Sequence, residues 1–393
     1  MTNLPQGWEK FNFDNIFYSP SSKNYQLNTK DYLEKGCIPI IDQSKKFIIG
    51  YSNDYEKVFK INNCNNSCII FGDHTRVLKF IDFDFIVGAD GVKILLNKDI
   101  ERFNTKFLFF QLLYKDIPLL GYRRHFSVLK QSTFSIPPLK EQERIVGILD
   151  ESFAKIDESI KILEQDLLNL DELMRSALQK AFNPLKDNAK EIYKLPQGWE
   201  WKSLGEISEI NPRNKIDDNI NVSFISMDKI LDGYSNDFSY KVKKWKEVKK
   251  GFTHFKQGDI GIAKITPCFE NRKSVIFDKL ENGFGAGTTE LHIIRANESV
   301  YSKFLLWFFK TEWFIQNGIL NMTGATGHKR ISKDFIKSLQ IPLPPLKEQE
   351  QIASHLDELS SHVKNLKQNY QAQIKDLQEL KKSLLDKAFK GNL

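Results

Sequence analysis

Two short segments rich in arginine, histidine and lysine occur at matched places in the two halves of the chain. Residues 122–126 read YRRHF and residues 326–330 read TGHKR, so Arg123 aligns with Arg330. Arg and Lys side chains bind phosphate oxygens, and Arg also pairs with base edges, so these segments could contact nucleic acid. A solvated loop would explain either segment alone. The recurrence in both halves favours a shared role.

Other loops carry similar chemistry, with Arg, Lys, Asn or His beside small or polar residues. The candidate nucleic-acid contacts from all these loops are Arg76, Arg123, Arg124, His125, Arg213, Asn214, Arg272, Lys273, His328, Lys329 and Arg330. The densest basic run is residues 241–250, for which an exposed hairpin is an equal explanation.

The chain lacks the short motifs of common nucleic-acid enzymes. It has no PD dipeptide of a metal-dependent nuclease core, no GxxxxGK[ST] phosphate loop, no GxSxG elbow and no HExxH. Residues 284–287 read FGAG and resemble the glycine turn of adenine methyltransferases, but the proline-rich motif of those enzymes is missing, since residues 211–214 read NPRN. We therefore expect residues 283–287 to form a loop between strands, and the chain to bind no cofactor and to catalyse nothing by itself.

The cysteines do not suggest a disulfide framework or a metal site. The four are Cys37, Cys64, Cys68 and Cys268, too few to cross-link a chain of this length. Cys64 and Cys68 have a spacing that zinc could use, but no second Cys/His pair completes four ligands, and His74 lies alone downstream. We expect reduced thiols and no metal.

The elements that position the basic loops occur in two copies. The motif LPQGWE at residues 4–9 recurs at 195–200, and PPLKEQE at 137–143 recurs at 344–350. The second match continues without a gap for 46 positions, with 19 identities. Each copy is therefore a variable globular part followed by a part of fixed length.

The fixed-length parts are predicted to be long helices, because each runs for more than forty residues without proline. Apolar residues at steps of three and four form a coiled-coil seam that we expect to serve in helix pairing and partner docking. The seam positions are Ile156, Ile160, Leu163, Leu167 and Leu170 in the first helix and Val363, Leu366, Tyr370, Ile374 and Leu377 in the second. Since the first helix must deliver the chain to the second globular part, the helices should pair antiparallel. Two helices that pack separately on their own domains are the alternative.

The expected fold is α+β, with two globular mixed α/β domains held apart by two long helices in an antiparallel coiled coil and a pseudo-two-fold internal repeat. The predicted boundaries are 1–139 for the first globular domain, 140–186 for the first helix, 187–346 for the second globular domain and 347–393 for the second helix. Strand-like runs are predicted at residues 67–71, 92–96, 222–225, 259–265 and 290–294.

The charge of the 393-residue chain, +7 in total, is concentrated in the globular parts. Residues 1–139 carry a net +4 and residues 183–346 a net +6, whereas residues 140–182 carry −4 and residues 347–393 carry +1. A nucleic-acid partner should therefore touch the globular parts. No stretch approaches the ~20 apolar residues of a membrane helix, and no secretory signal is evident, so we expect a cytoplasmic protein with no membrane partner.

The complete pattern resembles the specificity (S) subunit of type I restriction-modification systems. The LPQGWE opening of each copy, the PPLKEQE entry to each helix and the alternating variable and fixed parts carry this resemblance, which spans the entire chain. It implies two target recognition domains, each of which reads one half of a bipartite site in double-stranded DNA. It also implies that the helices set the gap and dock two methyltransferase (M) subunits, and through them restriction (R) subunits. S-adenosylmethionine is then expected on the M subunits.

Two other functions stay open on the sequence alone. One is a DNA-modifying enzyme with an unrecognised active site, which would methylate DNA as the purified chain with S-adenosylmethionine. The other is a coiled-coil adaptor that binds only proteins, which would leave no footprint on DNA in complex with its partners.

Overall fold

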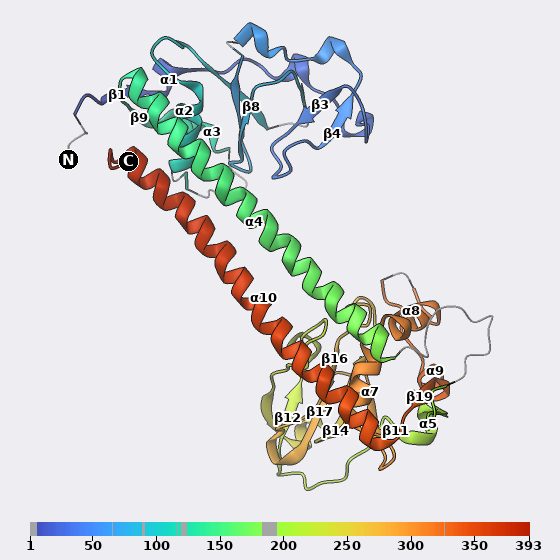
Figure 1. The fold of residues 1–393 in the computed structure, drawn as a ribbon. Helices are drawn as coiled ribbons and strands as arrows, with labels where there is room; N and C mark the ends of the chain where they lie inside the picture. Colours follow the sequence, from blue (N-terminus) through green and yellow to red (C-terminus); the bar gives the residue numbers. More distant parts are fainter. Residues whose placement is uncertain are drawn as a thin grey trace. The chain divides into compact units, whose positions relative to one another are not determined.

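A computed structural model describes residues 6–64, 66–88, 91–115, 117–118, 124–182, 195–325 and 327–393. The chain divides into two compact units. Unit 1 comprises Met1–Ile162 and Gln373–Leu393, and unit 2 comprises Leu163–Ala372. The division falls within both long helices, so each unit contains one globular part and a segment of each helix (Figure 1). In the described ranges, no helix combines the length and the apolar character needed to cross a membrane.

Each globular part is closed by a two-stranded antiparallel sheet built from its first and last strands. In unit 1, β1 (Glu9–Asn12) pairs with β9 (Thr133–Ile136). In unit 2, β10 (Glu200–Ser203) pairs with β19 (Gln340–Leu343). The chain therefore returns to its entry point before each long helix begins.

A four-stranded antiparallel sheet has the same strand order in both units. In unit 1 the order is β2 (Phe17–Tyr18), β8 (Val92–Asn97), β5 (Cys68–Gly72) and β6 (Leu78–Ile81). In unit 2 it is β11 (Ser208–Ile210), β18 (Leu291–Ala296), β15 (Ile260–Ala263) and β16 (Ser274–Ile276). Every residue of the central strands β5 and β15 is buried. The two copies thus share a core topology.

A second sheet is larger in unit 2. Its order in unit 1 is β4 (Gly50–Ser52), β3 (Ile38–Ile41) and β7 (Ile86–Val87). In unit 2 it is β13 (Lys241–Lys244), β12 (Asn221–Ile225), β17 (Phe284–Gly287) and β14 (Thr253–Lys256). The pairs β3–β7 and β12–β17 are both parallel. An isolated bridge between Phe59 and Phe85 in unit 1 stands where unit 2 has the strand β14.

Residues 283–287 do not form the loop that the sequence predicted, because residues 284–287 are the strand β17. A Cβ atom at Gly285 would lie 2.1 Å from the ring of Phe255, so only glycine allows this ring to lie against the strand. Phe255 in turn stacks on Phe277 with 3.8 Å between ring centroids. The glycines therefore serve packing.

Short helices complete both units. In unit 1 they are α1 (Phe13–Ile16), α2 (Thr105–Tyr114) and α3 (Phe126–Lys130), with 3-10 turns at Lys23–Tyr25, Thr29–Asp31, Tyr55–Lys57 and Ile61–Cys64. In unit 2 they are α5 (Leu204–Ile207), α6 (Trp245–Val248), α7 (Ser302–Phe309), α8 (Glu312–Leu320) and α9 (Lys333–Ser338), with 3-10 turns at Met227–Lys229 and Glu281–Gly283. The strongly apolar α7 is buried over most of its length.

The two long helices are continuous, as predicted. They are α4 (Leu139–Ala181) and α10 (Leu346–Phe389). Within unit 1, Asp157 of α4 forms an ion pair with Lys381 of α10, and Arg144 donates a hydrogen bond to the carbonyl of Leu393 at 2.8 Å. Residue numbers fall along α10 as they rise along α4, so these segments run antiparallel, which confirms the predicted direction.

The predicted seam residues differ in burial. On α4, Ile156 and Leu170 are buried and the others are half-buried: Ile160, Leu163 and Leu167. On α10, Val363 is buried and three are half-buried: Tyr370, Ile374 and Leu377. Leu366 departs from the prediction because it is 40% exposed. Its neighbour Lys367 contacts α4 instead, through an ion pair with Asp171.

The two repeated motifs touch each other where each long helix begins. Gly7 and Gly198 have φ values of +84° and +86°, which glycine adopts without strain. A Cβ atom at Gly198 would lie 3.4 Å from Pro345 of PPLKEQE. In the same joint, Trp199 Nε1 donates a hydrogen bond to Glu348 Oε1 at 3.2 Å. LPQGWE and PPLKEQE are therefore two parts of one structural joint.

The glutamine of PPLKEQE is buried and makes three hydrogen bonds at the start of α4. Gln142 Oε1 accepts from the N–H of Asn104 at 2.8 Å. Its Nε2 donates to the carbonyl oxygens of Arg102 at 2.9 Å and Pro137 at 2.8 Å. Asn104 is the N-cap of α2, so the start of the long helix is tied to the start of the first helix of the core.

Gln349 repeats this arrangement at the start of α10. Its Oε1 accepts from the N–H of Tyr301, the N-cap of α7, at 2.8 Å. Its Nε2 donates to the carbonyl oxygens of Ser299 at 3.2 Å and Pro344 at 2.8 Å. We call this feature of both units the glutamine clamp.

A buried phenylalanine stands at the end of each long helix: Phe182 directly follows α4 and packs in unit 2, and Phe389 is the last residue of α10 and packs in unit 1. In unit 1, Phe389 of α10 lies 5.4 Å from Phe107, measured between ring centroids, and stacks on Tyr114. In unit 2, Phe182 lies 5.1 Å from Phe304 and 5.8 Å from Phe308. Each helix is therefore fixed at both of its ends.

The clamp should contribute substantially to stability. Gln349→Ala should lower the free energy of unfolding by about 2 to 4 kcal/mol, because the part-buried N–H of Tyr301 and two carbonyl groups lose their partner. Urea denaturation followed by circular dichroism measures this. The exposed neighbour Gln351 provides the control, and Gln351→Ala should change stability by less than about 0.5 kcal/mol. Equal effects of the two substitutions would contradict the clamp.

Candidate nucleic-acid interface

A frame of backbone hydrogen bonds organises the basic loop of unit 2. The N–H of Lys264, directly after β15, donates to the carbonyl of Glu290 at 2.9 Å. The N–H of Ile331 donates to the carbonyl of Lys264 at 2.9 Å. Thr323 and Arg330 exchange backbone hydrogen bonds of 3.0 and 2.8 Å, which close the loop between them. The segments around Lys264, Glu290 and Thr323 are distant in sequence, and together they fix the backbone of the residues before Ile331.

Unit 1 contains the same frame. The N–H of Asp73, directly after β5, donates to the carbonyl of Gly91 at 2.7 Å. The N–H of His125 donates to the carbonyl of Asp73 at 2.9 Å. Asp73, Gly91 and His125 therefore take the places that Lys264, Glu290 and Ile331 have in unit 2.

This frame changes the correspondence between the two basic loops. Arg124 precedes His125 as Arg330 precedes Ile331, so Arg124 is the counterpart of Arg330. The sequence alignment instead paired Arg330 with Arg123, a residue that lies outside the described ranges. Arg124 is exposed and, in the part of the chain that the structure describes, its side chain has no partner.

Arg330 is held by a carboxylate. Its Nε and Nη2 donate to Glu290 Oε2 and Oε1, both at 2.9 Å, and its Nη1 donates to the carbonyl of His328 at 3.0 Å. The Arg330 guanidinium lowers the pKa of the Glu290 carboxyl, and the carboxylate raises the pKa of Arg330. His328 and Lys329, which precede Arg330, are exposed at the tip of the loop.

A buried histidine connects this loop to a second one. His292 Nε2 donates to the carbonyl of Ile331 at 2.9 Å, and its Nδ1 accepts from Asn211 Nδ2 at 3.3 Å. Asn211 has a φ of +57°, a left-handed value that asparagine tolerates. Burial lowers the pKa of His292, so it stays neutral and keeps both contacts. The loops at 211–215 and 328–330 therefore flank His292 on either side.

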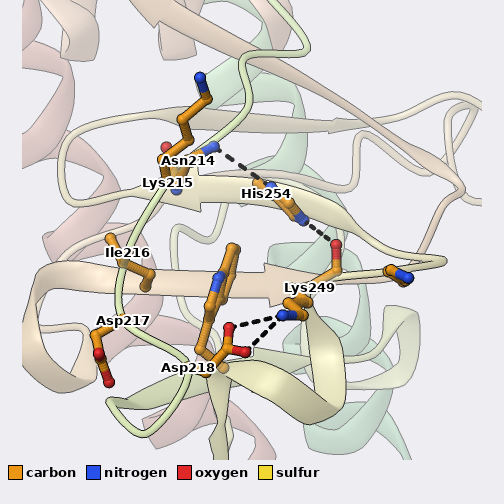
Figure 2. A pocket seen from close by; sticks show the side chains of 9 residues that line it. Asn214, Lys215, Ile216, Asp217, Asp218, Lys249 and His254 are labelled. Atoms are coloured by element: carbon orange, nitrogen blue, oxygen red, sulfur yellow. Dashed lines mark hydrogen bonds and ion pairs between the residues drawn. The ribbon is translucent and has the colours of Figure 1, made fainter.

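An open pocket of about 720 Å³ adjoins the 211–215 loop (Figure 2). Its lining residues are Asn214, Lys215, Ile216, Asp217, Asp218, Trp245, Lys249, Lys250 and His254. Lys249 Nζ is neutralised by both carboxylate oxygens of Asp218, at 2.6 and 2.8 Å. Lys215 and Lys250 are exposed and have no side-chain partner within the described ranges, so the pocket presents two free cations.

The wall of this pocket is fixed by His254. Its Nε2 donates to the carbonyl of Lys249 at 3.0 Å and its Nδ1 accepts from the N–H of Asn214 at 3.4 Å, as Figure 2 shows. Its ring lies 4.5 Å from that of Trp245, edge to face. Burial, together with the nearby Arg213 guanidinium, lowers the pKa of His254, which favours this neutral form.

Two predicted contacts of unit 1 need revision. His125 is completely buried, and its Nδ1 lies 2.9 Å from the carbonyl of Asp73, so its side chain anchors the loop and is not available to DNA. Arg76 is half-buried with a φ of +62°, and its Nη1 donates to the carbonyl of Ile117. Among the described residues of this group, Arg124 is the one that is exposed.

Three predicted contacts of unit 2 are engaged within the protein. Asn214 donates from Nδ2 to the carbonyl of Phe255 at 2.9 Å and accepts at Oδ1 from Arg295 at 3.0 Å. Lys273 Nζ donates to the carbonyl of Met227 at 3.2 Å. These two side chains therefore hold local structure.

Arg272 is the third predicted contact of unit 2 whose side chain is engaged within the protein. Its side chain is 18% exposed and pairs with Glu312, and its Nε donates to the carbonyl of Lys310 at 3.2 Å. Lys310 is fully buried and its Nζ donates in return to the Arg272 carbonyl at 3.3 Å. Arg272 thus belongs to a buried polar network. Arg213 is exposed, although its Nη1 donates to the carbonyl of Phe252 at 3.0 Å.

Sequence reasoning missed four residues of the site. Glu290 and His292 gave no local signal, because their partners lie about forty positions away. Lys250 lies in the basic run at 241–250, for which a nucleic-acid contact and an exposed hairpin are equal explanations. Lys215 follows the NPRN loop directly and could have been included with it.

Comparison with known proteins identifies the family to which this duplicated chain is similar. The family model described as type I restriction modification DNA specificity domain matches residues 5–167 and 196–376. The EcoAI specificity subunit of a type I restriction enzyme from Escherichia coli is 43% identical over 218 residues, which cover 54% of this chain and 37% of that protein. The EcoEI specificity subunit, also from Escherichia coli, is 39% identical with the same coverage. The matches thus span little more than a third of the length of these relatives.

The fold also has a solved counterpart. A chain from a structural study of complex assembly and conformational transition of the type I R-M system aligns over 100% of both chains, with a TM-score of 0.71 and 19% identity. At this identity the likeness concerns the fold.

The two histidines with lowered pKa predict a pH-dependent stability. The folded pKa of His254 and His292 lies below the unfolded value of about 6.5, so between these values the unfolded chain binds more protons. Stability should therefore fall as the pH drops below about 6.5, measured as the urea midpoint between pH 7.5 and 5.5. His254→Gln should reduce the fall, whereas His362→Gln, at an exposed position of α10, should not. A midpoint that rises towards pH 5.5 would contradict this assignment.

Proposed function

Because the chain belongs to the type I restriction modification DNA specificity family, we propose that it is the sequence-reading subunit of a type I restriction-modification complex. Its two target recognition domains each read one half of a bipartite site in double-stranded DNA. The two long helices set the spacing between the half-sites and dock two methyltransferase subunits. Restriction subunits join through the methyltransferases.

The observation that carries the proposal is the duplicated loop frame. In both units an arginine precedes the residue that donates its backbone N–H to the segment directly after the central strand. Arg124 precedes His125 in unit 1, and Arg330 precedes Ile331 in unit 2. A duplicated frame with different side chains is suited to reading two half-sites of different sequence. The positive charge of both globular parts supports the same partner.

The exposed arginine and lysine side chains are suited to different contacts with DNA. Arg124 and Arg330 can pair with the O6 and N7 acceptors of guanine, which is the commonest specific contact of arginine. Lys215, Lys250 and Lys329 are suited to phosphate oxygens, which orient a protein on the duplex without reading sequence. The two kinds of contact make separate predictions for substitution.

Methylation is assigned to a separate chain. The sequence lacks the motifs of methyltransferases and nucleases that were named above. In the proposed complex, the methyltransferase subunits bind S-adenosylmethionine. The long helices are suited to docking, since Leu168 and Leu173 of α4 are exposed. The reading subunit and its partners would then act as one complex.

Mapping methylated adenines across the genome, with and without this gene, tests the proposal. We expect a bipartite motif to be methylated only when both this chain and its methyltransferase partner are present. Methylation by the purified chain alone would favour an enzyme, and a motif that persists without the gene would contradict a reading role.

The two free lysines of the pocket, Lys215 and Lys250, should contribute equally to the affinity for duplexes of any sequence. Lys215→Ala and Lys250→Ala should each weaken binding to specific and non-specific duplexes to a similar extent, and should each reduce the slope of log K against log salt by about 1. Titrations at several salt concentrations measure this. Lys161→Ala, at an exposed position of α4, is the control of equal charge. A loss confined to one base position would reassign the lysine as a base contact.

A further inference from the structure

The contact between Arg330 and Glu290 leaves part of the guanidinium free. Glu290 takes the N–H of Nε and one N–H of Nη2, which is the side-on geometry of an arginine fork. The His328 carbonyl takes one N–H of Nη1. One N–H on Nη1 and one on Nη2 therefore remain, and the Arg330 side chain is 44% exposed.

These two remaining donors match guanine. One donor on each of two neighbouring nitrogens suits the O6 and N7 acceptors of one guanine in the major groove. An arginine held on its other edge has less rotamer freedom to lose when it binds, so the geometry is set in advance. The loop backbone adds to this, because Arg330 is also bonded to Thr323 through its N–H and carbonyl.

The counterpart of Glu290 in unit 1 carries no carboxylate. Gly91 occupies its place in the backbone frame, so no side chain at this position can hold Arg124. A side chain at Gly91 is also excluded, because a Cβ atom would lie 2.5 Å from Gln43 Nε2, and φ is +86°. The two copies therefore share an arginine but differ at the frame position that Glu290 occupies in unit 2.

We propose that Glu290 is a positioning residue for sequence reading, which holds Arg330 so that its free donors read a guanine in the half-site of unit 2. This inference rests on the proposed function and specifies one base of the half-site that unit 2 reads. The carboxylate also repels phosphates, so Glu290 increases discrimination between bases while it decreases affinity for DNA of any sequence. A residue with only a structural role would not shift these two quantities in opposite directions.

Selection from a random-sequence duplex library tests the inference, with the full chain in complex with its methyltransferase subunits. The wild-type complex should select a bipartite motif with a guanine at one position of one half-site. Glu290→Ala should reduce discrimination at that position by about tenfold and leave the other half-site unchanged. Its affinity for non-specific duplex at low salt should rise.

Matched variants separate positioning from folding. Arg330→Ala should lose discrimination at the same base, and Arg124→Ala should affect only the other half-site. Glu290→Gln, which keeps the shape of the side chain and one acceptor for Arg330, should show an intermediate loss at an unchanged melting temperature. Glu298→Ala removes an equal charge at an exposed position and should leave every base preference unchanged.

Two results would overturn the inference in different ways. A wild-type complex that selects no sequence overturns the proposed function and this inference together. A wild-type motif that Glu290→Ala retains with full discrimination overturns the inference alone, as does a Gln variant that lowers affinity for all sequences equally.

Discussion

Gln142 and Gln349 fix the direction in which each long helix leaves its globular part. Each side chain is buried and satisfied at both its oxygen and its nitrogen, so its rotation would leave several polar groups without partners. The clamp joins the first turn of a long helix to the N-cap of a core helix. Any function that requires a fixed angle between a globular part and its helix depends on this contact.

The loops that carry Arg124 and Arg330 are built in a different way from the clamp. Their shared frame consists of backbone hydrogen bonds, which do not depend on side-chain identity, so the exposed residues can differ between the copies without loss of the fold. Arg124 and Arg330 illustrate this, because the frame position that is Glu290 in unit 2 is Gly91 in unit 1. Under the proposed function, a scaffold of this kind acquires a new sequence preference by substitution at a few exposed positions.

The repeats and the helical periodicity predicted the duplicated plan and both long helices, because these features depend on local sequence. Strand runs such as 92–96 and 222–225 were also identified, since their apolar residues lie close together in sequence. The loops were harder. The burial of His125, the Arg330–Glu290 pair and the role of glycine in β17 all depend on residues distant in sequence, which composition does not reveal.

The proposed function requires two separate domains to read two separate half-sites. Hydroxyl-radical footprinting of the complete complex on its methylated motif tests this requirement. We expect two protected tracts separated by an unprotected gap, and Arg124→Ala should weaken protection in one tract only. A single continuous tract that responds as a whole to Arg124→Ala would contradict it.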